Sequence, residues 1–242
     1  MLVTRPTPEA SETAARLSAL DIEAVVEPLL IAQTLPTTLP QAAGFAALAV
    51  TSGTALRALR ERGEIERFLS LPVYAVGDKT AALASSLGFA RVVSARGNAD
   101  DLVALLAQAG IGGPVFYPAA RQQAGDLAKA LAPHGVMVIT AAVYEMVPAS
   151  RLSDRTLEEL RSGAIAAALF YSRRTAETFV ALTGALRDKA KLGMLCLSEN
   201  VAAPLVAAHF VRVGLADHPS EEAMLGLALS FARDQNGSML PQ

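Results

Sequence analysis

The chain has 242 residues, of which 52% are hydrophobic and 18% charged, and its formal net charge is −2. This composition is typical of a globular protein with one large or two small domains, without a basic surface that attracts nucleic acid or anionic membranes. The single cysteine, Cys196, excludes an intramolecular disulfide and CxxC motifs, and the lack of a signal-peptide pattern or a membrane-length apolar run leads us to expect a cytoplasmic protein.

Strands and helices alternate through the first half of the chain, as apolar runs between Gly/Pro breaks and Ala/Leu-rich stretches indicate. The predicted order is strand 2–4, helix 9–20, strand 22–27, connector 29–40, strand 45–50, helix 54–62, strand 73–76, helix 80–87, strand 91–94 and helix 99–109. The connector has two prolines and no helical periodicity, so we expect it to be extended.

The second half continues the alternation. The predicted order is strand 115–117, helix 122–132, strand 136–140, extended run 142–147, helix 153–162, strand 166–171, helix 175–187, strand 194–197, a helix after it, strand 211–214 and helix 219–233. The extended run ends at Pro148 and is a second connector, and residues 234–242 are predicted to fray. Such alternation is typical of doubly wound parallel sheets.

The chain contains an internal repeat. Residues 75–102 align without gaps to residues 196–223, an offset of 121, and weaker matches at offsets of 120 and 114 extend the similarity. The sequence therefore predicts two flavodoxin-like α/β domains.

The connectors, at about 29–40 and 141–149, predict two crossings between the domains. A domain of residues 39–142 would then be inserted into one made of residues 1–32 and 149–242. Two tandem domains would also explain the repeat.

Polar residues cluster where the predicted strands end, which is where open parallel sheets bind ligands. They are Thr4, Arg5, Thr51, Ser52, Asp78, Thr80, Ser94 and Tyr117, with Tyr171, Ser172, Arg173, Arg174, Ser198 and Asn200 in the other half. A strand that turns sharply into a helix leaves backbone N–H groups unpaired, which favours anions. If the connectors brought two such edges together, we would expect a cleft rich in hydroxyl and N–H groups.

Other catalytic motifs are missing from the sequence. GxGxxG, GxxxxGK[ST] and GxSxG do not occur, and His134, His209 and His218 lack metal-ligand spacing. Arg173–Arg174 can be read as a solvated pair or as an anion site. Tyr144, in the second connector, can be read as a packing residue or a functional one.

Five stretches resemble uroporphyrinogen-III synthases in both order and spacing. They are VTRP (3–6), TSGTAL (51–56), AVGDKTAALASSLGF (75–89), VYEMVP (143–148) and YSRRTAETF (171–179). The resemblance implies two α/β domains, the second inserted into the first through a two-stranded linker. It also implies a lyase, without cofactor or metal, that cyclises hydroxymethylbilane with loss of water and inversion of ring D.

The resemblance assigns roles to particular residues. Tyr144 matches the family tyrosine that acts as the acid at the leaving hydroxyl, a task that a bound water could also perform. Ser52, Thr80 and Ser172 match positions that contact substrate carboxylates, and Arg5 matches the arginine of the family's TRP motif.

The second half departs from the family pattern IG-x-x-TA. Ser198 replaces the turn glycine, Val201 replaces a hydroxyl residue, and Glu199 adds a negative charge. Arg173 or Arg174 is expected to offset that charge at the substrate site.

The expected partner is the small-molecule substrate, which the preceding deaminase could hand over, and nothing in the sequence requires more than a monomer. Two alternative functions stay open. The first is a two-domain ligand-binding or regulatory protein without chemistry, and the second is a flavin or nucleotide module, which would lack the usual phosphate loop.

Overall fold

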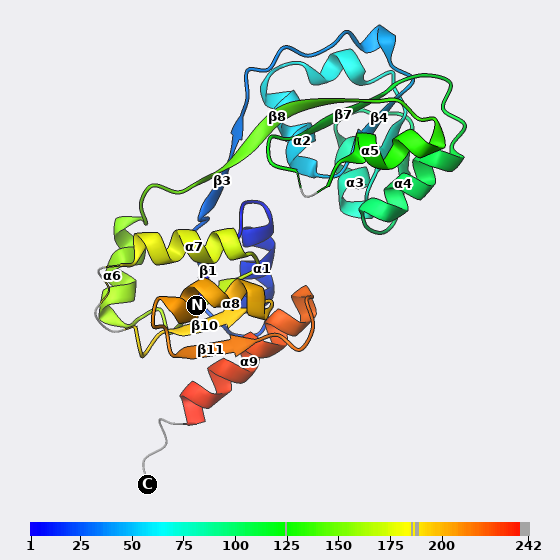
Figure 1. Ribbon diagram of the computed structural model, residues 1–242. Helices are drawn as coiled ribbons and strands as arrows, with labels where there is room; N and C mark the ends of the chain where they lie inside the picture. The colour runs from blue at the N-terminus through cyan, green and yellow to red at the C-terminus, as the bar shows by residue number, and fades with distance from the viewer. Residues whose placement is uncertain (124, 185, 187–188, 238–242) are drawn as a thin grey trace. The chain divides into compact units, whose positions relative to one another are not determined.

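The computed structural model describes residues 1–123, 125–184, 186 and 189–237 (Figure 1). Contacts within the chain divide it into two compact units. Unit 1 comprises Met1–Ile31 with Val147–Gln242, and unit 2 comprises Ala32–Met146. The chain passes from one unit to the other within two strands, β3 (Leu30–Thr34) and β8 (Val138–Pro148).

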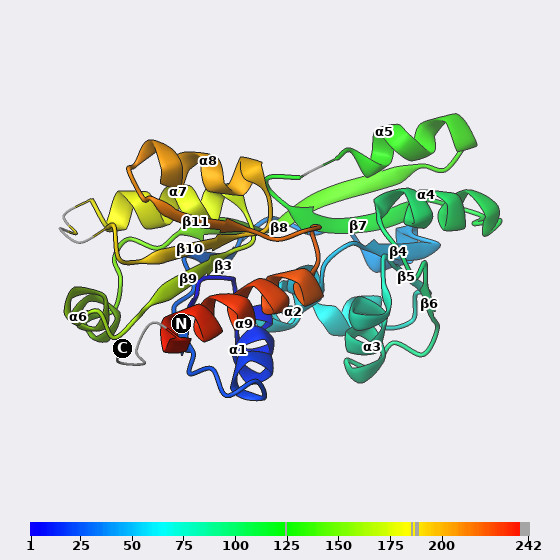
Figure 2. The ribbon, with the colours of Figure 1, turned by 90° about the horizontal axis from the view of Figure 1, so that it is seen from below.

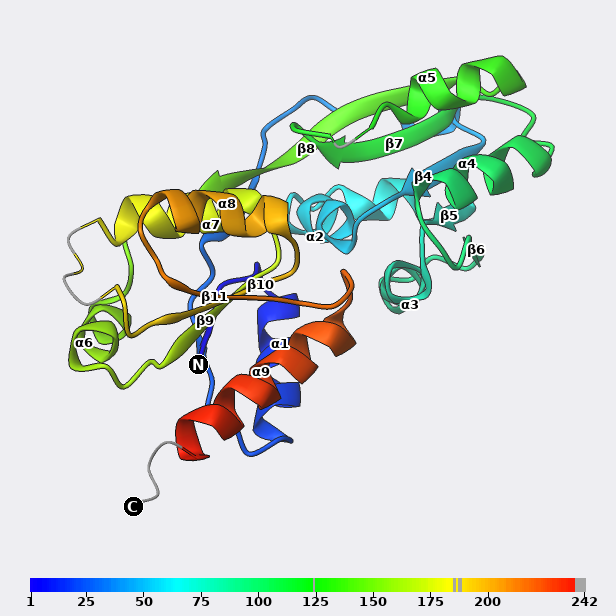
Figure 3. The same ribbon diagram turned by 60° about the horizontal axis from the view of Figure 1, so that its bottom comes forward.

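Unit 1 is built on a parallel sheet with the order β11-β10-β9-β1-β2. Its strands are β1 (Leu2–Val3), β2 (Val25–Val26), β9 (Ala167–Phe170), β10 (Gly193–Cys196) and β11 (Arg212–Leu215). Its helices are α1 (Glu9–Ser18), α6 (Asp154–Ser162), α7 (Arg173–Leu182), α8 (Glu199–Ala207) and α9 (Glu221–Gly237). Helices α1 and α9 cover one face of the sheet, and α7 and α8 cover the other (Figures 2 and 3).

The buried strand β9 explains how this layering arises. Ala167 and Leu169 pack on the side of α1 and α9, whereas Ala168 and Phe170 pack on the side of α7 and α8. Successive side chains of a strand point to opposite faces, so a continuous apolar run supplies both cores. Phe179 of α7 lies edge-on to Phe170, with ring centroids 5.1 Å apart.

Unit 2 is built on a sheet with the order β3-β8-β7-β4-β5-β6, in which the strands from β4 to β8 pair in parallel. The remaining strands are β4 (Ala47–Val50), β5 (Val73–Ala75), β6 (Val92–Ser94) and β7 (Val115–Ala120). The α-helices are α2 (Gly53–Glu61), α3 (Asp78–Ser86), α4 (Ala99–Gln108) and α5 (Leu127–Leu131). Helices α2 and α3 cover one face, and α4 and α5 cover the other (Figure 2).

The internal repeat corresponds to equivalent positions in the two sheets. The repeat offsets pair β9, β10 and β11 with β4, β5 and β6, and they pair β1 and β2 with β7 and β8. In space, the order β11-β10-β9-β1-β2 therefore matches the order β6-β5-β4-β7-β8 strand for strand. The predicted α/β fold with parallel sheets and alternating helices is confirmed.

The two connectors contain the paired strands β3 and β8, and residues 35–40 of the first connector have no regular secondary structure. The backbone N–H of Leu35 donates to the carbonyl of Val143 over 2.9 Å, and that of Ala149 donates to the carbonyl of Leu29 over 3.0 Å. These two bonds show that β3 and β8 run in opposite directions along each other. The connector backbone is therefore hydrogen-bonded and does not form a loose loop.

Some predicted boundaries differ from the structure. The helix predicted over residues 122–132 begins only at Leu127, as the short α5. Before it, the N–H of Arg121 binds the carbonyl of Tyr144 and continues the extended chain beyond β7. Helix α7 begins at Arg173, two residues earlier than predicted. Helix α9 extends to Gly237, so the predicted fraying is wrong for residues 234–237. The predicted end of α7 at Arg187 and the fraying predicted for residues 238–242 lie outside the described residues. Over the described ranges, no helix is long and apolar enough to span a bilayer.

Candidate active site

The carboxyl ends of β1, β9 and β10 meet at one edge of the unit 1 sheet, because these strands are parallel neighbours. After β9 and β10 the chain turns directly into α7 and α8, with Ser172 and Ser198 as the N-cap residues. The first turns of these helices touch, since Nη1 of Arg173 donates to Oδ1 of Asn200 over 3.2 Å. The structure thus brings four residues selected from the sequence together at one edge.

Ser172 and Ser198 differ in whether their hydroxyls cap the helices that follow them. The hydroxyl of Ser172 accepts a hydrogen bond from the backbone N–H of Thr175 over 3.2 Å and lies 2.7 Å from the Thr175 hydroxyl. Ser198 makes no side-chain cap hydrogen bond. The N–H groups of the first turn of α8 therefore lack the side-chain partner that α7 has, and they face the edge together with the positive end of the helix dipole.

Arg173 and Arg174 occupy the first turn of α7, where the helix dipole disfavours positive charge. The Nε of Arg173 pairs with Glu177 at 2.8 Å, with both side chains about half exposed. Arg174 is exposed and lines a pocket of about 290 Å³. The other lining residues are Pro148, Ala149, Glu177, Thr178, Ala181 and Leu182.

Arg5 follows β1 and is held by three neighbours. Its Nη1 pairs with the carboxylate of Glu221, the first residue of α9, and donates to the hydroxyl of Thr13 over 3.2 Å. That hydroxyl in turn donates to Oε1 of Glu221 over 2.8 Å. The guanidinium carbon lies 4.1 Å from the centre of the Tyr171 ring, a cation–π contact.

Tyr171 directly precedes Ser172 and has a buried hydroxyl. Among the described residues, this hydroxyl makes no hydrogen bond of standard geometry, although it lies beside Thr13 and Glu221. Burial, followed by the negative charge of Glu221, raises the pKa of Tyr171 to about 12, and the positive charge of Arg5 partly offsets this.

Unit 2 has an equivalent edge at the ends of β4 and β5. Ser52 caps α2, and its hydroxyl accepts a hydrogen bond from the backbone N–H of Thr54 over 3.2 Å. Thr80 lies in the first turn of α3, whose N-cap residue Gly77 has no side chain to offer. Ser52 and Thr80 therefore stand at neighbouring strand ends, and α3 resembles α8 in lacking a side-chain cap.

Tyr144 lies on β8 and is 8% exposed. Its side chain packs in the core of unit 2, whose other members include Phe116 and Val143. The hydroxyl of the nearby Tyr117 is 2.8 Å from the hydroxyl of Thr51. Burial raises the pKa of Tyr117, and the proximity of Tyr144 adds to this increase. The sequence puts Thr51 and Tyr117 at strand ends. Only the structure reveals that their hydroxyls are hydrogen-bonded to each other near Tyr144.

The residues that depart from the family pattern have distinct surroundings. Val201 is buried in the core of unit 1, whereas Thr80, its counterpart at the offset of 121, is only partly buried. Glu199 is exposed in the first turn of α8. Valine at position 201 is thus a packing residue, and the charge of Glu199 faces solvent.

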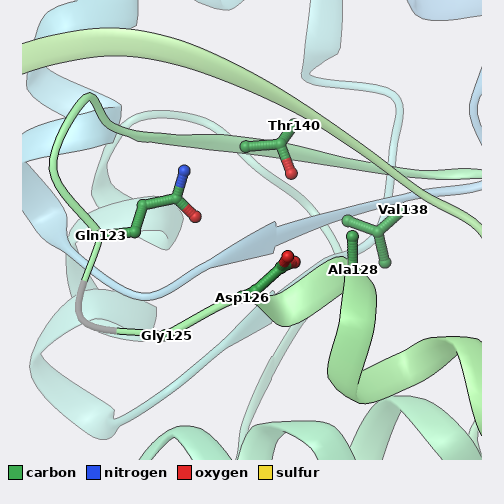
Figure 4. A pocket seen from close by; sticks show the side chains of 6 residues that line it. All are labelled: Gln123, Gly125, Asp126, Ala128, Val138 and Thr140. Carbon is green, nitrogen blue, oxygen red and sulfur yellow. The ribbon is translucent and has the colours of Figure 1, made fainter.

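A pocket of about 670 Å³ lies in unit 2, on the side of α5 (Figure 4). Its lining residues are Gln123, Gly125, Asp126, Ala128, Val138 and Thr140. None of the site residues selected from the sequence is among them. Over the described parts of the chain, no three His, Cys, Asp or Glu residues lie close enough to hold a metal ion.

A chain with two parallel α/β sheets, and with serine and threonine at the helix starts along their carboxyl edges, has the features of a small-ligand enzyme. The family model described as "HEM4: Uroporphyrinogen-III synthase HemD" matches residues 11–226. The chain belongs to the uroporphyrinogen-III synthase family, as the sequence predicted. It is accordingly a cyclising lyase of tetrapyrrole biosynthesis with a small-molecule substrate, as also predicted.

Solved structures have a similar fold. Uroporphyrinogen-III synthetase from Helicobacter pylori is 22% identical, with a TM-score of 0.63 over 95% of this chain and 98% of that chain. A mutant uroporphyrinogen III synthase from the extremely thermophilic bacterium Thermus thermophilus is 19% identical, with a TM-score of 0.50 over 98% of each chain. No curated protein sequence matches the chain.

Proposed function

We propose that this chain converts hydroxymethylbilane to the type III isomer of uroporphyrinogen using the carboxyl edges of its two sheets. The observation that carries the proposal is the set of helix starts at these edges, which hold Ser52, Thr80 and Ser172. The sequence resemblance matches these three residues to substrate-contacting positions of the family. Hydroxyl groups and first-turn N–H groups suit the carboxylates of the substrate. Arg173 and Arg174 add positive charge beside Ser172, and Arg5 belongs to the same edge.

Tyr144 is the proton donor in this proposal. Its phenol protonates the terminal hydroxyl of the substrate, the C–O bond breaks and water departs, so that a protonated azafulvene and a phenolate remain. The azafulvene carbon then bonds to the substituted carbon of the far pyrrole, ring D, which gives a spiro intermediate. The bond from that carbon to its original methylene bridge breaks, and the released methylene carbon bonds to the unsubstituted carbon of ring D, so that the ring is inverted. The proton lost from the pyrrole on final closure restores the phenol, so atoms and charge balance. Holding the ends of a flexible chain together is the protein's other contribution.

The proposal includes the family's domain layout. We infer that residues 1–32 with 149–242 form one flavodoxin-like domain and that residues 39–142 form a second, inserted through a two-stranded linker. In chain order the strands of unit 1 lie as 5-4-3-1-2, the flavodoxin-like arrangement read in reverse. We further propose a cytoplasmic monomer without cofactor that receives its substrate from the preceding deaminase.

The test is an isomer assay. Purified protein is given hydroxymethylbilane generated in the same vessel, and the products are oxidised and separated by chromatography. Formation of the type III isomer supports the proposal, and the protein-free reaction, which yields the type I isomer, is the control. If only the type I isomer forms while the protein binds the substrate tightly, the chain is a ligand-binding protein and the proposal is wrong.

A further inference from the structure

Arg5 and Glu221 join four elements of unit 1 through one set of contacts. Arg5 follows β1, Thr13 belongs to α1, Tyr171 follows β9 and Glu221 begins α9. The ion pair, the two hydrogen bonds of Thr13 and the cation–π contact close a ring of interactions around the Arg5 guanidinium. None of these contacts is between near neighbours in sequence, except that of Arg5 with Thr13.

The Arg5–Glu221 ion pair is more deeply buried than the neighbouring Arg16–Glu222 ion pair. The side chains of Arg5 and Glu221 are 24% and 22% exposed, whereas Arg16 and Glu222, which join α1 to the same helix α9, are 45% and 73% exposed. A partly buried pair with a shared hydroxyl partner has a fixed geometry, whereas an exposed pair adds little to stability. Arg16–Glu222 is therefore a matched control for Arg5–Glu221.

The contacts of Arg5 point to a role other than direct substrate binding. Its Nη1 binds Glu221 and Thr13, and its guanidinium carbon lies over the Tyr171 ring. Tyr171 is followed directly by Ser172, the N-cap of α7. Movement of the Tyr171 ring would move the serine whose hydroxyl and neighbouring N–H groups form the proposed carboxylate site.

We propose that Arg5 and Glu221 act as a positioning pair, which holds the Tyr171–Ser172 turn in place for a substrate carboxylate. This inference rests on the proposed function. Arg5 is then a positioning residue, and its effect on the substrate is transmitted through Tyr171. Glu221, the first residue of α9, becomes equally necessary.

Two single variants distinguish a positioning role of Arg5 and Glu221 from a direct effect of their charges on the substrate. Arg5→Met removes one positive charge and Glu221→Gln removes one negative charge, so an effect of charge on a polyanionic substrate would shift KM in opposite directions. If the pair positions the Tyr171–Ser172 turn, both variants should lower kcat/KM, each by roughly tenfold. The double variant should be no worse than either single one, because the two residues act as one unit.

The controls test the geometry and the docking of the helices. Arg5→Lys keeps the charge but loses the planar contact with Tyr171, so it should restore activity only in part. Arg16→Gln and Glu222→Gln should leave kcat/KM unchanged, since that pair does not contact Tyr171. If Glu221→Gln lowers KM while Arg5→Met raises it, Arg5 binds substrate directly and the positioning inference is overturned.

A second measurement does not depend on catalysis. With ring-labelled tyrosine, the NMR signals of Tyr171 can be assigned by their loss in Tyr171→Phe, since the chain has only four tyrosines. Positioning predicts that these signals shift in Arg5→Met and in Glu221→Gln, but not in Arg16→Gln. If wild-type protein forms no type III isomer, the proposed function is wrong. The NMR signals of Tyr171 would still show whether Arg5 and Glu221 position its ring. Unchanged Tyr171 signals in both variants would overturn the positioning inference alone.

Discussion

Tyr171 has a buried hydroxyl with no hydrogen bond of standard geometry in the described structure, and its pKa is raised to about 12. The ordinary pKa, which applies in the unfolded chain, is 10.0. Between these values the folded chain retains a proton that the unfolded chain has lost. The free energy of unfolding should therefore be insensitive to this group below about pH 10 and should fall as the pH rises toward 12.

Chemical denaturation of wild-type protein and Tyr171→Phe at increasing pH tests this expectation. The variant has no proton to lose at this position, so its stability should decline less steeply, with the remaining decline due to groups such as Tyr117 and Cys196, whose pKa values are also raised. At neutral pH the variant should be as stable as the wild type, because it loses an unpartnered hydroxyl. Parallel curves in alkali would contradict the raised pKa of Tyr171.

A variant of Tyr144 can test its proposed role as proton donor separately from its contribution to stability. Tyr144→Phe keeps the ring in the core of unit 2 and removes only the hydroxyl, so stability should change by less than about 1 kcal/mol. Loss of a proton donor should lower kcat by roughly a hundredfold or more. Steady-state isomer assays measure this, with Tyr74→Phe on β5 as the control. An unchanged kcat in Tyr144→Phe would leave a bound water as the donor.

The helices of unit 1 differ in how their first turns are completed. Ser172 caps α7 with its hydroxyl, whereas Ser198 at the start of α8 does not. Ser172→Ala should therefore lower the free energy of unfolding by about 1 kcal/mol, and Ser198→Ala should have little effect. Urea denaturation of the two variants makes the comparison. Equal losses would show that the caps are equivalent.

Arg62 binds the backbone of the first connector at two positions. Arg62, at the end of α2, has a side chain that is 14% exposed and donates to the carbonyls of Leu35 and Thr37 at 2.5 Å each. Thr37 in turn donates to the carbonyl of Ala142 over 2.6 Å. The first connector is therefore held both by its partner strand and by the end of helix α2, whose N-cap residue is Ser52.

Removing this arginine should loosen the connector. Arg62→Met leaves two carbonyls without their donor, so amide hydrogen exchange in residues 34–40 should accelerate by roughly tenfold. Arg60→Met, which changes an exposed neighbour on the same helix, is the matched control. Exchange that is equally slow in both variants would show that pairing with β8 alone holds the connector.

Local patterns predicted much of the fold and part of the site. The alternation of strands and helices, the internal repeat and the two connectors are all visible in the sequence, because each depends on short-range periodicity and on proline and glycine. The same logic selected Ser52 and Ser172 at strand ends, which the structure finds at helix starts. It placed the start of the helix before residue 132 five residues too early, because the hydrogen bond of Arg121 with β8 continues the extended chain beyond β7.

The sequence by itself determined the family, the parallel α/β class and the polar residues at the strand ends, since these follow from neighbouring residues along the chain. Only the tertiary structure decided the strand order, with β1 between β9 and β2, and the pairing of Arg5 with Glu221 across 216 residues. Such contacts depend on which elements pack together, and that depends on burying both faces of each sheet at once. No local pattern records this choice.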